Sequence, residues 1–94
     1  VEVEHARIYA ATGAQIESTD VVLRDVTVVP EKGAALILNN VKNFRAEDFA
    51  CPVDMKCALV VTGSRNRDIR ISSKEISAAN ARLSAGAAPA VTFE

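Results

Sequence analysis

The chain has little of what many binding sites are built from. Its 94 residues include no Trp, one Tyr, three Phe, one His, one Met and two Cys. Sugar-binding modules usually stack flat aromatic rings on pyranose faces, so this composition disfavours that class. A zinc site needs three or four ligands, and two cysteines with one histidine are too few. The sequence therefore predicts no bound metal.

Charge and hydropathy disfavour further classes of partner. The chain carries eleven basic and twelve acidic residues, interspersed, with a formal net charge of −1. There is no basic stripe for nucleic acid, and no apolar run reaches the length of about eighteen residues that a membrane span requires. A glycine-rich phosphate loop and a nucleotide fingerprint are also absent. We therefore expect no nucleic acid, membrane or cofactor to be bound.

What the chain does have is a repeated hydrophobic pattern. The apolar residues Val21, Leu23, Val26 and Val28 repeat those found twenty positions earlier, and the segment 34–38 recurs 23 positions later. Within each repeat, apolar and polar residues alternate as they do in β-strands, and no long helical pattern separates the strands. A period of this length predicts stacked β-coils that bury one another's apolar faces.

The pattern also predicts where each coil turns and how the coils align. The inward positions change parity around residues 24–25, which requires a bend or a bulge, and glycine turns are expected at 11–13 and 31–33. The ladders Ala14–Ala34–Cys57 and Ile16–Leu36–Leu59 are expected to form one interior stack. An outer apolar patch is expected at Ala35, Ile37, Ala58 and Val60, and Asn43 is expected above Asn66. The asparagines are interpreted either as an amide ladder at a corner or as two unrelated loop residues.

Two of the predicted coils resemble a known family. Residues 13–28, GAQIESTDVVLRDVTV, resemble a coil of the right-handed parallel β-helix of family 28 glycoside hydrolases, the polygalacturonase-like enzymes. Residues 59–71, LVVTGSRNRDIRI, resemble another. The similarity covers most of the chain up to Ser73, and pectate lyases and phage tailspikes share much of the pattern. It implies an all-β fold, a right-handed parallel β-helix (pectin-lyase-like solenoid) of three to four short coils.

The catalytic motifs of that family are not matched. Its members carry Asn-Thr-Asp, Asp-Asp, Gly-His-Gly and Arg-Ile-Lys, whereas the nearest approaches here are Ser18-Thr19-Asp20, Glu47-Asp48 and Arg70-Ile71-Ser72. Glycoside hydrolysis needs two carboxyl groups held about 5–10 Å apart across the scissile bond. The sequence offers no such pair on the predicted cleft sheet, so we expect no catalytic residue in this chain.

Two groups of side chains remain as candidates. The spacing of Cys51 and Cys57 is compatible either with a disulfide or with two buried thiols. Arg65, Arg67 and Arg70 are candidates for substrate binding, because a guanidinium can hold a uronate carboxylate with two hydrogen bonds. The alternative is a solvated face, since these arginines fall on a predicted turn and on the outward side of a strand.

These observations lead to one hypothesis and one alternative. We interpret residues 1–94 as a single β-solenoid segment, the C-terminal fragment of a larger β-helix, with 72–90 as a looser capping loop. The resemblance implies a structural, capping role in a secreted or periplasmic glycoside hydrolase acting on plant-type polysaccharide. The alternative is a self-associating, non-enzymatic β-solenoid module for adhesion or assembly. The expected partners are the remainder of the same β-helix or another copy of the chain, with polysaccharide reached through the parent enzyme.

Overall fold

The computed structural model describes residues 2–10, 14–17, 19–53 and 55–94, which form nine strands and two single-turn 3-10 helices. One sheet contains β1 (Glu2–Ala10), β3 (Thr19–Pro30), β5 (Lys42–Glu47), β7 (Arg67–Ile71) and β9 (Val91–Phe93). The other contains β2 (Ala14–Ile16), β4 (Leu36–Asn39), β6 (Leu59–Thr62) and β8 (Ala81–Leu83). The 3-10 helices are η1 (Ala78–Asn80) and η2 (Ala88–Ala90).

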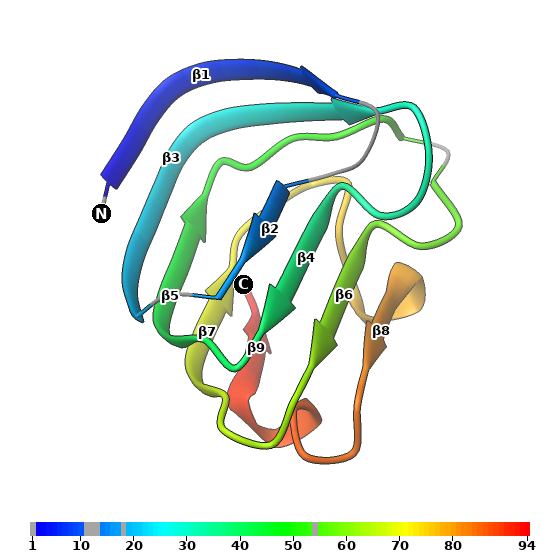
Figure 1. Ribbon diagram of the computed structural model, residues 1–94. Helices are drawn as coiled ribbons and strands as arrows, with labels where there is room; N and C mark the ends of the chain where they lie inside the picture. The colour runs from blue at the N-terminus through cyan, green and yellow to red at the C-terminus, as the bar shows by residue number, and fades with distance from the viewer. Residues whose placement is uncertain (1, 11–13, 18, 54) are drawn as a thin grey trace.

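Each strand pairs in parallel with the equivalent strand of the next coil (Figure 1). The odd-numbered strands form one sheet and the even-numbered strands the other, so the chain alternates between the two sheets as it advances. The result is a parallel β-solenoid of about four turns, which confirms the predicted fold class. Among the described residues, no helix has the length and apolar character needed to cross a membrane.

Residues with a left-handed backbone bend the long strands at one level of the solenoid. His5, Asp25 and Asp48 have φ values of 54°, 51° and 50°, and the strand register places them in one column. Short polar side chains tolerate this conformation better than β-branched or bulky ones. In β3 the buried positions are odd before Asp25 and even after it, so the bend predicted at 24–25 is confirmed.

A second left-handed column marks the corner between the two sheets. Asp20, Asn43 and Asp68 have φ values of 57°, 52° and 50°, and the Asn43 side-chain amide donates a hydrogen bond of 2.8 Å to the Asp20 carboxylate. The polar ladder at this corner therefore consists of Asp, Asn and Asp, and the predicted stacking of Asn43 on Asn66 is wrong. Asn66 is instead buried in the neighbouring turn, where its side-chain oxygen accepts the Val41 N–H at 2.9 Å.

The hydrophobic core is a set of columns that run through the middle coils. Leu36 pairs with Leu59, as predicted, and both side chains are completely buried. The other large side chains with less than 2% of their surface exposed are Val26, Val28, Leu38, Val41, Phe44, Phe49, Val61, Ile69 and Ile71. Burial of this kind stabilises by roughly 25 cal/mol for each Å² of apolar surface removed from water.

The first interior stack is displaced by two residues from the predicted alignment. Ile16 pairs with Leu38 and not with Leu36, so the predicted Ile16–Leu36–Leu59 stack is wrong at its first member. The turn between positions 30 and 36 is two residues longer than the equivalent turn between positions 10 and 14. A constant twenty-residue repeat cannot account for that insertion. The turn predicted at 11–13 lies outside the described residues, as does Ser18.

The outer face of the even-numbered sheet is less apolar than predicted. Ala35 and Ala58 are completely buried, because they precede β4 and β6 at the corner where the chain turns into these strands. Ile37 and Val60 are half-buried on the outer face. Cys57 is also half-buried and lines the same surface groove as Val60, so its predicted place in an interior stack is wrong.

Residues 72–90 continue the solenoid along its side. The Phe49 N–H donates to the Ser72 carbonyl at 3.2 Å, and the Ala58 N–H donates to the Asn80 carbonyl at 2.7 Å. Ile76 is 3% exposed, so this segment contributes to the core, and β8 pairs with β6. Residues 91–93 form β9, which pairs with β7. The assignment of 72–90 as a cap stays a prediction.

The turn after β6 generates the first testable prediction. Gly63 has φ of 97°, and a Cβ built there would overlap the Asn40 side-chain oxygen, which accepts the Arg65 N–H at 3.1 Å. We expect Gly63→Ala to lower the free energy of unfolding by about 2–3 kcal/mol, because backbone strain and the lost hydrogen bond add. Urea denaturation followed by circular dichroism measures the change.

Gly33→Ala is the matched control for this substitution. Gly33 also has a positive φ, 74°, but nothing lies within 4 Å of a Cβ built there. This variant should lose about 1 kcal/mol, which is the cost of the left-handed backbone alone. Equal losses for the two glycines would contradict the role assigned to Asn40.

Candidate functional site

The three predicted arginines lie on one corner of the solenoid. Arg65 is in the turn before β7, Arg67 opens that strand and Arg70 follows within it, and all three are exposed. Arg67 and Arg70 line a groove of about 540 Å³, while Arg65 and Arg67 line an adjoining groove of about 310 Å³. The structure therefore brings Arg67 beside each of the other two arginines but does not bring Arg65 and Arg70 into one groove.

Two further cations, which the sequence analysis missed, belong to this corner. Lys42 is the strand partner of Arg67, and Arg45 is the strand partner of Arg70. Neighbouring strands lie about 4.8 Å apart, and like charges directly opposite each other on a sheet are destabilising. These two pairs are 25 residues apart in sequence, so a repeat of 20 or 23 residues does not reveal them. We call the five residues Lys42, Arg45, Arg65, Arg67 and Arg70 the basic corner.

Most of these cations have no acidic partner. Arg45 contacts Glu47 at 3.5 Å. The side chains of Lys42, Arg65, Arg67 and Arg70 form no ion pair or hydrogen bond with the described residues. An anion in the grooves would offset their mutual repulsion, and guanidinium groups bind carboxylate, sulfate or phosphate in a bidentate manner. The basic corner is thus suited to weak binding of an anionic ligand, with no chemistry of its own.

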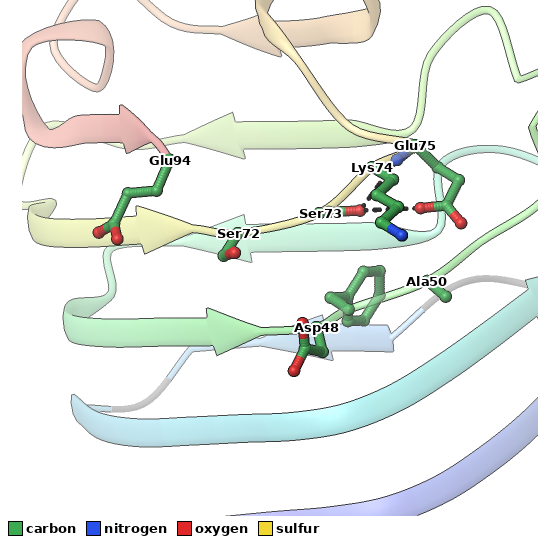
Figure 2. Close-up of a pocket in the computed structure, with 8 residues that line it drawn as sticks. Asp48, Ala50, Ser72, Ser73, Lys74, Glu75 and Glu94 are labelled. Carbon is green, nitrogen blue, oxygen red and sulfur yellow. Dashed lines mark hydrogen bonds between the residues drawn. The ribbon is translucent and has the colours of Figure 1, made fainter.

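A second pocket combines carboxylates and hydroxyls on the side of the solenoid (Figure 2). It encloses about 340 Å³, and Asp48, Ser72 and Glu94 follow the ends of neighbouring strands around it. Glu75, at the other end of the pocket from Glu94, accepts a hydrogen bond from the Ser73 hydroxyl at 3.4 Å. These groups could contact a polyhydroxylated ligand through hydrogen bonds.

The carboxylates of this pocket lack the surroundings of a glycosidase pair. A general acid is kept protonated at neutral pH by burial in an apolar site, whereas Asp48 and Glu94 are exposed. Glu47, the other half of the predicted Glu47-Asp48 approach, forms ion pairs with Arg24 at 3.1 Å and with Arg45 at 3.5 Å. No three His, Cys, Asp or Glu side chains are grouped to hold a metal ion within the described part of the chain.

An alternating column of charge runs along the outer face of the odd-numbered sheet near its first edge. Arg24 of β3 contacts Glu4 of β1 at 2.8 Å and Glu47 of β5 at 3.1 Å, and it lies 3.6 Å from Glu2. The pKa of Arg24 is raised, most of all by the hydrogen bonds that its guanidinium donates to Glu4 and Glu47. The Arg24 side chain is 40% exposed, so solvent screens each of these ion pairs.

His5 forms an ion pair at the first bend. Its Nδ1 lies 2.8 Å from the Asp25 carboxylate, and this hydrogen bond, with the charges of Asp25 and Glu4, raises the pKa of His5 above 6.5. Because the folded state favours the charged imidazolium, the stability from this pair is full below pH 6.5 and is lost as the pH rises through the raised pKa. His5 is thus explained as a partner of the bend residue Asp25.

The thiols of the two cysteines lie in different environments. Cys51 is buried, and its pKa is raised to about 11 because burial disfavours the thiolate and the Glu75 charge adds to this effect. Cys57 is half-buried and its thiol lies 3.6 Å from the Leu59 carbonyl oxygen. The disulfide considered from the sequence stays a prediction, and chemistry at the two thiols can test it.

Alkylation should distinguish the two thiols. At pH 8 a thiol with a pKa near 11 is ionised in only on the order of one molecule in a thousand, so we expect iodoacetamide to modify Cys57 and to spare Cys51 in the folded protein. The rate at Cys51 should rise with pH up to about 11. Peptide mass spectrometry measures both sites. Equal labelling would contradict the assigned burial, and labelling of neither without a reductant would demonstrate the disulfide.

Comparisons with known proteins give no match, so a proposal about function rests on the fold and on the geometry of its surface. No family model, no curated protein and no solved structure matches the chain. The resemblance to family 28 glycoside hydrolases therefore rests on the coil pattern in residues 13–28 and 59–71 alone. What is established is a parallel β-solenoid with a basic corner and a carboxylate-lined side pocket.

Proposed function

We propose that the chain is a structural, non-catalytic segment of a larger parallel β-solenoid, whose hydrophobic interior it extends. Following the resemblance, the parent would be a polygalacturonase-like glycoside hydrolase that is secreted or periplasmic and acts on plant-type polysaccharide. The chain would form C-terminal coils of that β-helix. Its partners would be the neighbouring coils at its ends.

One observation carries this proposal: the interior is complete in the middle coils and incomplete in the end coils. The central side chains, such as Leu38 and Ile69, are completely buried. The equivalent inward side chains of both end coils are only half-buried, namely Val3, Ala6 and Ile16 at one end and Ala81, Leu83, Val91 and Phe93 at the other. Each coil of a solenoid relies on its neighbours to bury its apolar face, so the end coils are suited to contact further coils.

The basic corner supports the polysaccharide part of the proposal. Two like-charged strand pairs, Lys42 with Arg67 and Arg45 with Arg70, lie beside open grooves. Neighbouring strands lie about 4.8 Å apart, so each pair presents two positive charges at that separation along the solenoid axis. A linear polyuronate, with one carboxylate on each sugar, fits that arrangement. The role would be to hold polymer near a catalytic site elsewhere in the parent protein.

The central claim is tested by truncating two side chains of one column. Ile16 and Leu38 are strand partners, the first half-buried in an end coil and the second fully buried one coil further in. In the monomeric chain, we expect Leu38→Ala to cost about 3–4 kcal/mol and Ile16→Ala to cost about 1–2 kcal/mol. Urea denaturation gives both values, and light scattering verifies that the chain is monomeric.

Both substitutions remove a similar apolar volume, so a difference between their losses in the free energy of unfolding reflects the difference in burial. Equal losses in the monomer would mean that the Ile16 end of the interior is already closed, and the proposed role as an incomplete segment would then fail. In a form of the protein in which a further coil covers β1 and β2, the cost of Ile16→Ala should rise to that of Leu38→Ala.

Binding of polygalacturonate tests the role of the basic corner. We expect the Arg67→Gln, Arg70→Gln double variant to lose at least about tenfold in affinity, and moderate salt to weaken binding by the wild-type chain. Arg82→Gln is the control, because Arg82 is exposed on β8 in the other sheet. Microscale thermophoresis measures each affinity. Equal binding of a neutral polysaccharide, or an equal loss for Arg82→Gln, would refute the site.

A further inference from the structure

The charge on the β1 edge indicates what kind of coil covers it. β1 is the first strand of the five-stranded sheet and pairs only with β3 among the described strands. Its outer face carries Glu2 and Glu4, and Arg24 of β3 contacts both of them as well as Glu47 of β5. Three carboxylates thus surround one guanidinium, with Arg45 beyond Glu47. At the open edge the negative charge is in excess.

The column suggests how that excess is relieved. From β1 to β5, the aligned positions are Glu4, Arg24 and Glu47, so the charge alternates from one coil to the next. Opposite charges directly across neighbouring strands stabilise a sheet, and like charges destabilise it. A coil placed on β1 would continue this alternation if it carried Lys or Arg opposite Glu4.

The bend adds a second requirement for the covering strand. The residue after Glu4 is His5, which belongs to the left-handed column with Asp25 and Asp48. A strand that follows β1 along all of its nine residues must bend at the same level, and this favours Asp, Asn, His or Gly there. The covering strand therefore needs a basic residue followed directly by one of these, as in Arg24-Asp25 of β3.

The β9 edge of a second copy does not meet the first requirement. Ile71 pairs with Phe93, and the Glu94 N–H donates to the Ile71 carbonyl. Glu94 therefore lies in the same column as Glu4, Arg24 and Glu47, after the uncharged Ser72. Stacking two copies head to tail in register would place Glu94 opposite Glu4. That contact is repulsive.

We propose that the β1 edge binds a β-coil that carries a basic residue opposite Glu4 and a left-handed residue opposite His5, and that it does not bind the β9 edge of another copy. This inference rests on the proposed function, because it specifies the neighbour that the solenoid segment requires. The surface consists of the β1 backbone edge, the half-buried Val3 and Ala6, and the carboxylates Glu2 and Glu4.

A peptide made from the chain's own second coil is the probe. Residues 19–30 contain Arg24-Asp25 and have the length of β3. We expect a fluorescently labelled peptide of this sequence to bind the full chain saturably at low salt, as measured by anisotropy. Arg24→Glu in the peptide should weaken binding by about tenfold or more, because it opposes Glu4 with a like charge.

A charge swap separates this inference from the proposed function. Glu4→Arg in the protein should restore binding of the Arg24→Glu peptide. Glu94→Arg, at the other edge, should leave both peptide affinities unchanged at protein concentrations at which light scattering finds that variant monomeric. Binding that ignores the charge at Glu4 would overturn the inference and leave the proposed function standing. If neither peptide binds, the inference is overturned. The proposed function is then judged by comparing the stability losses of Ile16→Ala and Leu38→Ala.

Light scattering tests the exclusion of a second copy. We expect the wild-type chain to be monomeric at micromolar concentration and low salt. Glu94→Arg should promote association, since it replaces a repulsive pair by an attractive one in the head-to-tail stack. Head-to-tail oligomers of the wild-type chain that Glu94→Arg does not strengthen would overturn this part of the proposal.

Discussion

The structure depends on the parallel hydrogen bonding between one coil and the next. The strand partners are separated by 20 residues for Glu2 and Val22, by 23 for Leu36 and Leu59, and by 25 for Lys42 and Arg67. No strand pairs with another strand of its own coil among those described. A single coil therefore has neither a closed sheet nor a closed core, and its stability comes from its neighbours. The half-buried end coils and the open β1 edge follow from this constraint.

The same constraint arranges side chains of one kind into columns. Where the backbone must bend in every coil, aligned positions carry residues that tolerate a left-handed conformation, as at Asp20, Asn43 and Asp68. Where side chains face inward, the columns are apolar and tightly buried. On the outer face the columns carry charge, either alternating, as around Arg24, or alike, as at the basic corner. The alternating column stabilises the stack, and the like-charged pairs destabilise it.

Hydrophobic periodicity was sufficient to predict the solenoid, because a solenoid repeats its pattern at nearly constant spacing. It predicted the bend at Asp25 and the pairing of Leu36 with Leu59 for the same reason. The alignment failed where turns differ in length. Two additional residues in the turn before β4 moved Ile16 onto Leu38, and two more in the turn after β6 placed Asp68, and not Asn66, opposite Asn43.

The candidate site could be predicted only in part for related reasons. The arginines stand close together in sequence, so their grouping on a turn and a strand was visible. Their pairing with Lys42 and Arg45 was not, because it depends on the 25-residue offset that the longer turn creates. The burial of Ala35 and Ala58 was missed because alternation assigns them outward, whereas each lies just before its strand begins. Turn length, which periodicity does not report, thus determines the composition of the functional surface.

The apolar interior and the charged outer columns make different contributions to coil pairing. Apolar columns accept any neighbour of suitable shape, since burial of apolar surface is not directional. They would therefore stack a coil on a wrong neighbour nearly as well as on the right one. Charge in a fixed register discriminates, because a mismatch places like charges directly opposite each other. In this chain Glu4 and Glu94 lie at the two edges of the described sheet, and we propose that they discriminate between neighbours there.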